Sequence, residues 1–147
     1  MKIQNYIDQS PAFALNLASN LVMTRVNAFL KKEKVNLLQG LTLTALFFEG
    51  TDEITPSALA KTLQTTRTNM SHILSELESR GWIKRVLDEK DSRRFHIRLK
   101  PEGRKKALQL IRLYDEIQES FEKQLGVETC QKLTRGLALL TRAADGV

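Results

Sequence analysis

Residues 64–81, QTTRTNMSHILSELESRG, have the pattern of a short amphipathic helix with defined ends. Apolar side chains recur there at intervals of three and four residues, which places them on one inward face of a helix. These residues are Met70, Ile73, Leu74 and Leu77. The Thr66 hydroxyl can cap the start of the helix, and Gly81 can adopt the left-handed conformation that ends one. The stretch therefore predicts a helix that packs one face against a core.

The outward face of this helix has an unusual composition for a surface. It carries hydroxyls, an amide, an imidazole and one guanidinium, and no acid occurs before Glu76. Such side chains let a helix approach a polyanion closely and can bond phosphates or base edges in a DNA major groove. A neutral Ser/Thr-rich face without a partner is the alternative. The candidate DNA-binding residues on this helix are Thr66, Arg67, Thr68, Asn69, Ser71, His72 and Ser75.

The segment after this helix predicts a β-hairpin. Residues 82–99, WIKRVLDEKDSRRFHIRL, read as an apolar strand, a polar tip and a return strand of alternating character. The alternation places Phe95, Ile97 and Leu99 on one face of the return strand.

Two shorter helices are expected upstream of residue 64. One starts around Leu43 and ends by Gly50, and the other opens with Thr55 as its cap and Pro56 at its first position. Short helices followed by a hairpin form a winged helix-turn-helix. The predicted fold class is therefore mainly α, with a small β-hairpin wing.

Positive charge is concentrated around the hairpin. The 147-residue chain has a net charge of +6 and a pI near 9.6. Residues 82–106 hold ten Lys or Arg against four Asp or Glu, so the rest of the chain is neutral overall. A solvated charge run is one explanation, and a polyanion site is the other. The length and the 41% hydrophobic content suit one domain with a substantial core.

Long apolar stripes flank this centre on both sides. We expect one helix from Pro11 to about Lys32, a second over Pro101–Leu125 and a third from Val127, with Gly126 as a breaker. The stripes comprise Leu15, Ala18, Val22, Val26 and Phe29; Ala107, Leu110, Tyr114, Ile117 and Phe121; and Cys130, Leu133, Leu137 and Leu140. They predict either an intramolecular core or a helical dimerisation platform. The expected organisation is one compact chain with dimerisation helices at 1–40 and 101–147 around a DNA-binding region at 41–100.

No group of residues indicates an enzyme or a metal site. His72 and His96 lie on the proposed DNA-binding face without a nearby acid or thiol at ligand spacing. The acids Glu49, Asp52 and Glu53 are typical of a solvated loop. We therefore expect no catalysis, no metal and no cofactor.

The single cysteine, Cys130, excludes an internal disulfide and favours a reducing, cytoplasmic setting. Its inward position predicts a buried structural thiol, with a thiol-based redox sensor as the alternative. The apolar stretch at residues 12–30 is interrupted by polar residues. Neither a signal peptide nor a membrane anchor is expected from it.

From about Leu41 to Gly103 the sequence resembles the MarR family of bacterial transcriptional regulators, and the helical flanks are similar to that family's dimerisation domain. The resemblance rests on SALAKTL at 57–63, ILSELESRGWIKR at 73–85 and DSRRFHIRLKPEG at 91–103. It implies a homodimeric repressor that binds a pseudo-palindromic operator in double-stranded DNA and is released by a small aromatic or phenolic inducer. The family usually has a Thr at this point that can cap the next helix, whereas this chain has Lys100. The resemblance therefore does not define where that helix begins.

The resemblance also implies roles within the hairpin. Arg93 matches the family's wing-tip arginine, which enters the minor groove, because a narrow A·T-rich groove concentrates negative potential. Asp91 would orient that arginine, and Lys84, Arg94 and Arg98 would contact phosphates. A winged helix that docks a protein and has lost DNA binding is an alternative from a different functional class.

Overall fold

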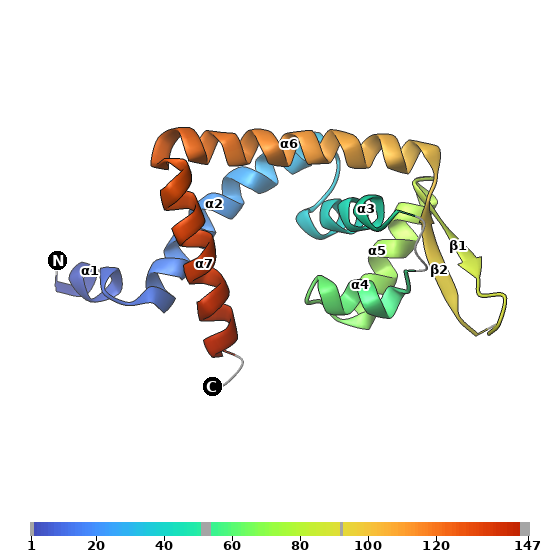
Figure 1. The fold of residues 1–147 in the computed structure, drawn as a ribbon, viewed down its shortest axis with the longest axis horizontal. Helices are drawn as coiled ribbons and strands as arrows, with labels where there is room; N and C mark the ends of the chain where they lie inside the picture. The colour runs from blue at the N-terminus through green and yellow to red at the C-terminus, as the bar shows by residue number, and fades with distance from the viewer. Residues whose placement is uncertain (1, 51–53, 92, 145–147) are drawn as a thin grey trace. The chain divides into compact units, whose positions relative to one another are not determined.

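The computed structural model describes residues 2–50, 54–91 and 93–144 of the chain, so Asp52 and Glu53 of the expected acidic loop lie outside the described residues. The backbone forms two compact units, Met1–Leu110 and Ile111–Val147. In chain order the described elements are α1 (Lys2–Asp8), α2 (Pro11–Lys32), α3 (Leu37–Glu49), α4 (Pro56–Thr62), α5 (Arg67–Ser79), β1 (Ile83–Leu87), β2 (Phe95–Leu99), α6 (Pro101–Leu125) and α7 (Val127–Ala144) (Figure 1). This mainly helical architecture with one hairpin confirms the predicted fold class.

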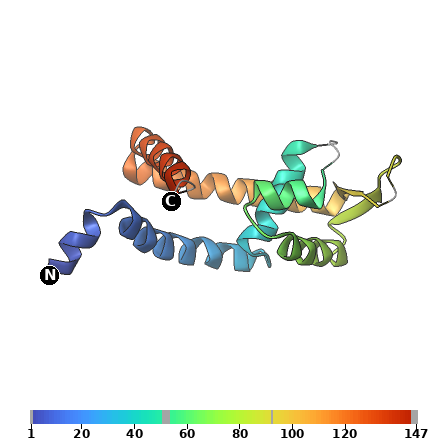
Figure 2. The same ribbon diagram turned by 90° about the horizontal axis from the view of Figure 1, so that it is seen from below.

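The core of the first unit lies between α3, α4, α5 and the hairpin, which are neighbours in both views (Figures 1 and 2). Met70 and Leu77 from α5 pack there with Leu43 from α3. Ile83 and Ile97 contribute from the two strands. Each of these side chains is at most 1% exposed. Burying an aliphatic side chain of this size stabilises a fold by about 1.5–3 kcal/mol, so this cluster holds the helices and the hairpin together.

The helix predicted from residues 64–81 is confirmed. α5 begins after Thr66, whose hydroxyl accepts a hydrogen bond from the backbone N–H of Asn69 at 3.1 Å. Gly81 follows the helix in the left-handed conformation, with φ +73°. The apolar residues assigned to the inward face are all buried. The two faces of α5 therefore point as the spacing predicted.

α3 begins at Leu37, earlier than the predicted start near Leu43. The Asn36 side chain accepts a hydrogen bond from the Gln39 backbone N–H at 2.8 Å, and the Gln39 side chain accepts one from the Asn36 backbone N–H at 2.9 Å. This capping box satisfies two N–H groups at the helix start. The sequence prediction followed the apolar spacing and missed this signature. The short helix α1 was also not predicted.

Burial in the hairpin differs from the predicted alternation. β1 and β2 pair antiparallel. Phe95 is 38% exposed, whereas His96 is buried beside Ile97, and Leu99 is half-buried. His96 tolerates burial because its ring Nε2 is hydrogen-bonded to Asp88 at the hairpin tip. The expected apolar face of Phe95, Ile97 and Leu99 was therefore wrong at Phe95.

α6 begins at Pro101 directly after β2, although the usual capping threonine is replaced by Lys100. The Lys100 backbone N–H donates to the Trp82 carbonyl oxygen at 2.9 Å, and the Arg104 N–H donates to the Lys100 carbonyl at 2.9 Å. Gly103 lies against the same Trp82 carbonyl, because a Cβ at this position would be 1.9 Å from that oxygen. Backbone contacts at the base of the wing therefore locate the helix start.

Gly103→Ala should lower the free energy of unfolding by roughly 1–3 kcal/mol, because the added methyl collides with backbone rather than with a flexible side chain. Denaturant unfolding of the purified protein measures this change. Lys105→Ala, on the exposed side of the same turn, is the matched control and should stay within about 0.5 kcal/mol of the parent. A Gly103→Ala protein as stable as the parent would contradict the close approach.

The apolar stripe of α2 is largely uncovered in the first unit. Leu15 and Phe29 are exposed, and Val22 and Val26 are half-buried. Further exposed apolar side chains lie on α1 and α2: Ile3, Tyr6, Phe13, Leu17 and Leu21. An intramolecular core therefore does not account for this stripe, and the dimerisation alternative gains support.

The second unit consists of the end of α6 and of α7. Gly126 separates the two helices at φ +84°. Cys130 is buried, as predicted, whereas Leu133 and Leu137 from the same stripe are exposed. The stripe on α7 is thus mostly uncovered as well.

No helix among the described residues is long and apolar enough to cross a membrane.

Candidate nucleic-acid interface

The outward face of α5 presents its polar side chains to solvent. All the candidate residues from Thr66 to Ser75 on this face are exposed. Thr66 uses its hydroxyl as the helix cap, and the Asn69 side chain donates to the Thr65 hydroxyl at 2.9 Å. Within the described residues, Arg67, Thr68 and His72 form no side-chain hydrogen bond with another part of the chain. Their polar groups are therefore available for an external partner.

Arg85 joins α5 to the wing, and sequence reasoning did not single it out. Its guanidinium donates to the Ser75 hydroxyl at 3.0 Å and lies 3.6 Å from the Glu78 carboxylate. Its backbone N–H donates to the same carboxylate at 3.3 Å, and its guanidinium lies 5.9 Å from the centre of the Phe95 ring. The Ser75 hydroxyl, predicted to contact DNA, is thus also a structural acceptor. Arg85 lies on β1, beyond the end of α5 at Ser79, so no local spacing in the sequence signalled these contacts.

Asp91 brings two arginines together at the tip of the hairpin. Its Oδ1 accepts from the Arg93 backbone N–H at 3.0 Å and lies 3.4 Å from Arg93 Nε, while its Oδ2 lies 3.6 Å from Arg94 Nε. The Arg93 and Arg94 side chains are nevertheless 90% and 72% exposed. Exposed ion pairs add little stability. The contacts therefore mainly orient guanidiniums that stay accessible to a polyanion.

Asp88 organises the backbone of the same tip, and sequence reasoning missed it. Its Oδ1 accepts from the backbone N–H groups of Lys90 and Asp91 at 2.7 and 3.0 Å. Its Oδ2 lies 2.8 Å from His96 Nε2. The expectation that His96 has no nearby acid and faces DNA was therefore wrong, because the imidazole is buried and held by Asp88. The Asp-x-x-Asp spacing within the turn could have indicated this role.

Two further basic residues lie opposite each other on the strands. Lys84 pairs with Arg98 across the hairpin, and both side chains are exposed. They add positive charge along the strands between α5 and the tip.

Among the described residues, no group of three or more His, Cys, Asp or Glu could hold a metal ion.

The part of the chain that contains α5 and the first strand of the hairpin matches known proteins. A sequence model of the MarR family matches residues 35–94. The transcriptional repressor MprA of Escherichia coli K12 is 35% identical over 89 residues, which is 60% of this chain and 50% of MprA. Over this part of its length, the chain is similar to the MarR family. The HTH-type transcriptional regulator PrsX of Escherichia coli is 33% identical over 86 residues, 58% of this chain and 52% of PrsX. The chain thus spans about half the length of the curated relatives it matches.

Solved structures resemble this chain over most of its length. Staphylococcus aureus MepR in complex with DNA has a TM-score of 0.82 at 25% identity, covering 91% of this chain and 98% of MepR. NadR in complex with 4-hydroxyphenylacetate has a TM-score of 0.72 at 27% identity, covering 89% of this chain and 92% of NadR. The likeness therefore includes the helices that flank the winged helix-turn-helix.

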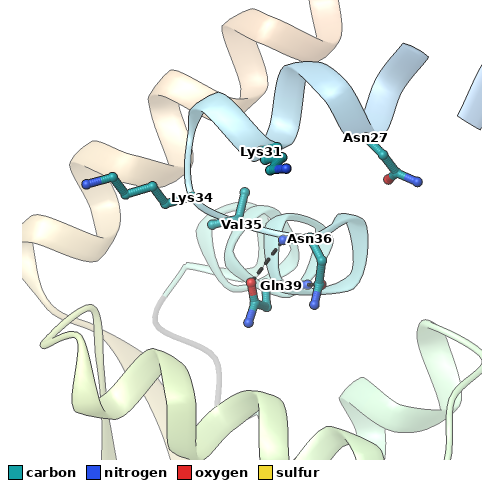
Figure 3. A pocket seen from close by; sticks show the side chains of 6 residues that line it. All are labelled: Asn27, Lys31, Lys34, Val35, Asn36 and Gln39. Atoms are coloured by element: carbon teal, nitrogen blue, oxygen red, sulfur yellow. Dashed lines mark hydrogen bonds between the residues drawn. The ribbon is translucent and has the colours of Figure 1, made fainter. Parts of the chain in front are cut away.

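Two neighbouring clefts lie among the described residues of the first unit, and Asn27 and Asn36 line both of them. The larger, of about 410 Å³, also has Lys31 and Lys34 in its wall, together with Val35 and the Gln39 of the α3 capping box (Figure 3). The smaller, of about 350 Å³, extends to α5. Its remaining lining residues are Leu37, Leu38, Asn69, His72, Ile73 and Glu76. A molecule in the smaller cleft would touch the same helix that presents the candidate DNA-binding residues.

The pKa of the Asp88 carboxyl is lowered from 3.8 to about 2. The largest cause is the hydrogen bond with His96, and the next are the hydrogen bonds from the backbone N–H groups of Lys90 and Asp91. Because the folded pKa is depressed, the resulting stabilisation is present above pH 3.8 and is lost as the pH falls through about 2. An NMR titration of the Asp88 carboxyl should show this depression. His96→Leu should move the pKa back towards 3.8, and a parent carboxyl that already titrates there would contradict the hydrogen-bond geometry.

Proposed function

We propose that this protein is a homodimeric regulator of transcription that binds double-stranded DNA sequence-specifically through α5 and the wing, and that it acts as a repressor. The observation that carries the proposal is the pairing of an exposed helix face, which has no acid before Glu76, with a wing whose arginines are oriented but accessible. The MepR–DNA complex, in which a chain of similar fold binds DNA, supports it. A protein of this kind acts on bacterial DNA in the cytoplasm.

In this proposal α5 enters the major groove. Thr68 and His72 are the residues that read base edges, because they are exposed and near the start of the helix, where short side chains reach furthest into a groove. Arg67, Asn69 and Ser71 contact bases or phosphates beside them. Ser75, engaged by Arg85, contributes mainly to the placement of the wing.

The wing contributes in two ways. Arg93, held by Asp91, enters the minor groove, where it reads groove width rather than base identity. Lys84, Arg94 and Arg98 neutralise phosphates, which adds affinity without sequence preference. Asp91 orients the arginines and Asp88 holds the backbone of the turn. Neither acid contacts DNA in this proposal, because a carboxylate is repelled by phosphate.

Substitutions on α5 and on the wing should have different consequences for DNA binding. Thr68→Ala and His72→Ala should change which sequences are preferred, by roughly 1–3 kcal/mol per lost base contact. Arg98→Ala should weaken binding to all sequences alike and reduce the salt dependence by about one phosphate contact. Arg93→Ala should weaken binding mainly to sites with A·T-rich flanks. Titrations on selected and scrambled duplexes at several salt concentrations measure these differences.

Glu102→Ala, an exposed change in the first turn of α6, is the control and should leave sequence preference unchanged. If Thr68→Ala, His72→Ala and Arg93→Ala all bind as the parent does, the DNA-contact assignment is wrong. The protein-docking alternative would then replace it.

The uncovered stripes on α2 and α7 support a dimer built from the N- and C-terminal helices. Light scattering at micromolar concentration should give about twice the chain mass of 16.7 kDa. Leu21→Glu, which places a charge among exposed apolar residues of α2, should shift the protein towards the monomer. Arg112→Glu, a charge change at an exposed position of α6, is the control. A parent protein that is monomeric and still binds its operator tightly would contradict this arrangement.

We also propose that a small aromatic or phenolic effector relieves DNA binding. The two clefts beside α3 support this, because the smaller one reaches Asn69 and His72 on α5. NadR, which is similar in fold, was solved in complex with 4-hydroxyphenylacetate. Titration with a panel of small aromatic acids, followed by the amide NMR signals of Asn36 and His72, tests the site. Release of DNA by an acid that leaves both signals unmoved would contradict it.

A further inference from the structure

The two aspartates of the wing tip have different partners. Asp91 lies next to the guanidiniums of Arg93 and Arg94. Asp88 instead accepts from the backbone N–H of Asp91 and contacts the buried His96. One acid therefore holds side chains that point outward, and the other holds the backbone on which the first acid sits.

The contact between Asp88 and His96 is shielded from water. The His96 side chain is 8% exposed and that of Asp88 17%. Breaking a buried polar contact costs free energy, because both groups would lose a hydrogen-bond partner without gaining a hydrogen bond to water. Since His96 belongs to β2 and is paired in register with Val86 of β1, the two strands anchor Asp88 through this contact.

The tip is closed by a second set of hydrogen bonds. The Asp88 backbone N–H donates to the Arg94 carbonyl at 2.9 Å, and the Arg94 N–H donates to the Asp91 carbonyl at 2.9 Å. A continuous chain of contacts thus runs from His96 through Asp88 and Asp91 to Arg93.

We propose that Asp88 and His96 are positioning residues that hold Asp91, and through it Arg93, in the geometry that enters the minor groove. This inference rests on the proposed DNA-binding function and deepens it. Neither residue touches DNA. Their effect is pre-organisation, because an arginine that is already oriented loses less conformational freedom on binding. Selectivity for A·T-rich flanks therefore depends on two residues that face the interior of the wing.

The test compares Asp88→Ala with Asp88→Asn on two duplexes that share a core and differ only in A·T-rich or G·C-rich flanks. Asp88→Ala should lower the preference for A·T flanks by roughly 2- to 10-fold, the range expected for one long side chain losing its order. Asp88→Asn should retain most of the preference, because its amide oxygen still accepts from the two backbone N–H groups and its N–H₂ can bond the imidazole.

The same substitutions in an Arg93→Ala background separate positioning from general stability. If Asp88 acts through Arg93, Asp88→Ala should have no further effect on flank preference once Arg93 is absent. An equal loss of affinity on both duplexes, or the same loss with and without Arg93, would overturn the inference. A parent protein that binds neither duplex would instead refute the proposed function, and with it this inference.

A second variant keeps the test decisive if Asp88→Ala does not fold. His96→Leu fills the buried site but removes the contact with Asp88. It should lower the preference for A·T flanks as Asp88→Ala does and should increase the mobility of Arg93 Nε in ¹⁵N relaxation measurements. Unchanged flank preference and unchanged Arg93 mobility in this variant would overturn the positioning role.

Discussion

The architecture depends on the burial of one face of α5. Met70, Ile73, Leu74 and Leu77 enter the core formed with α3, α4 and the hairpin, and each of them is at most 5% exposed. A helix that buries one face in this way has no freedom to rotate, so its other face must point outward. The same packing that stabilises the first unit therefore also presents the polar side chains proposed to read DNA.

The wing is held at its base and at its tip by different physical means. At the base, Gly103 approaches the Trp82 carbonyl so closely that only a hydrogen fits, and Arg85 connects the first strand to Ser75 and Glu78 of α5. At the tip, Asp91 neutralises part of the positive charge of Arg93 and Arg94, and both guanidiniums stay exposed to solvent. This combination gives a hairpin that is fixed to α5 at its base and has accessible cations at its tip, which suits recognition of a charged groove.

The elements with strong local signals could be predicted from the sequence. The apolar spacing of α5, its threonine cap and Gly81 defined that helix, and the long stripes defined α2, α6 and α7. Predictions failed where two distant residues act together. His96 looked like an exposed polar residue on an alternating strand because its partner Asp88 lies across the turn, and Arg85 gave no sign of its contacts with α5. The start of α3 was missed because its signal is a pair of polar residues, Asn36 and Gln39, and not an apolar repeat.

The most direct test of the account is methylation interference on an operator selected from random duplexes. Dimethyl sulfate modifies guanine N7 in the major groove and adenine N3 in the minor groove, so one reagent reports on both grooves. We expect N7 methylation to block binding in two half-sites about one helical turn apart, and N3 methylation to block it in the A·T-rich flanks. Interference in neither groove, with binding that depends only on salt, would contradict the placement of α5 and the wing.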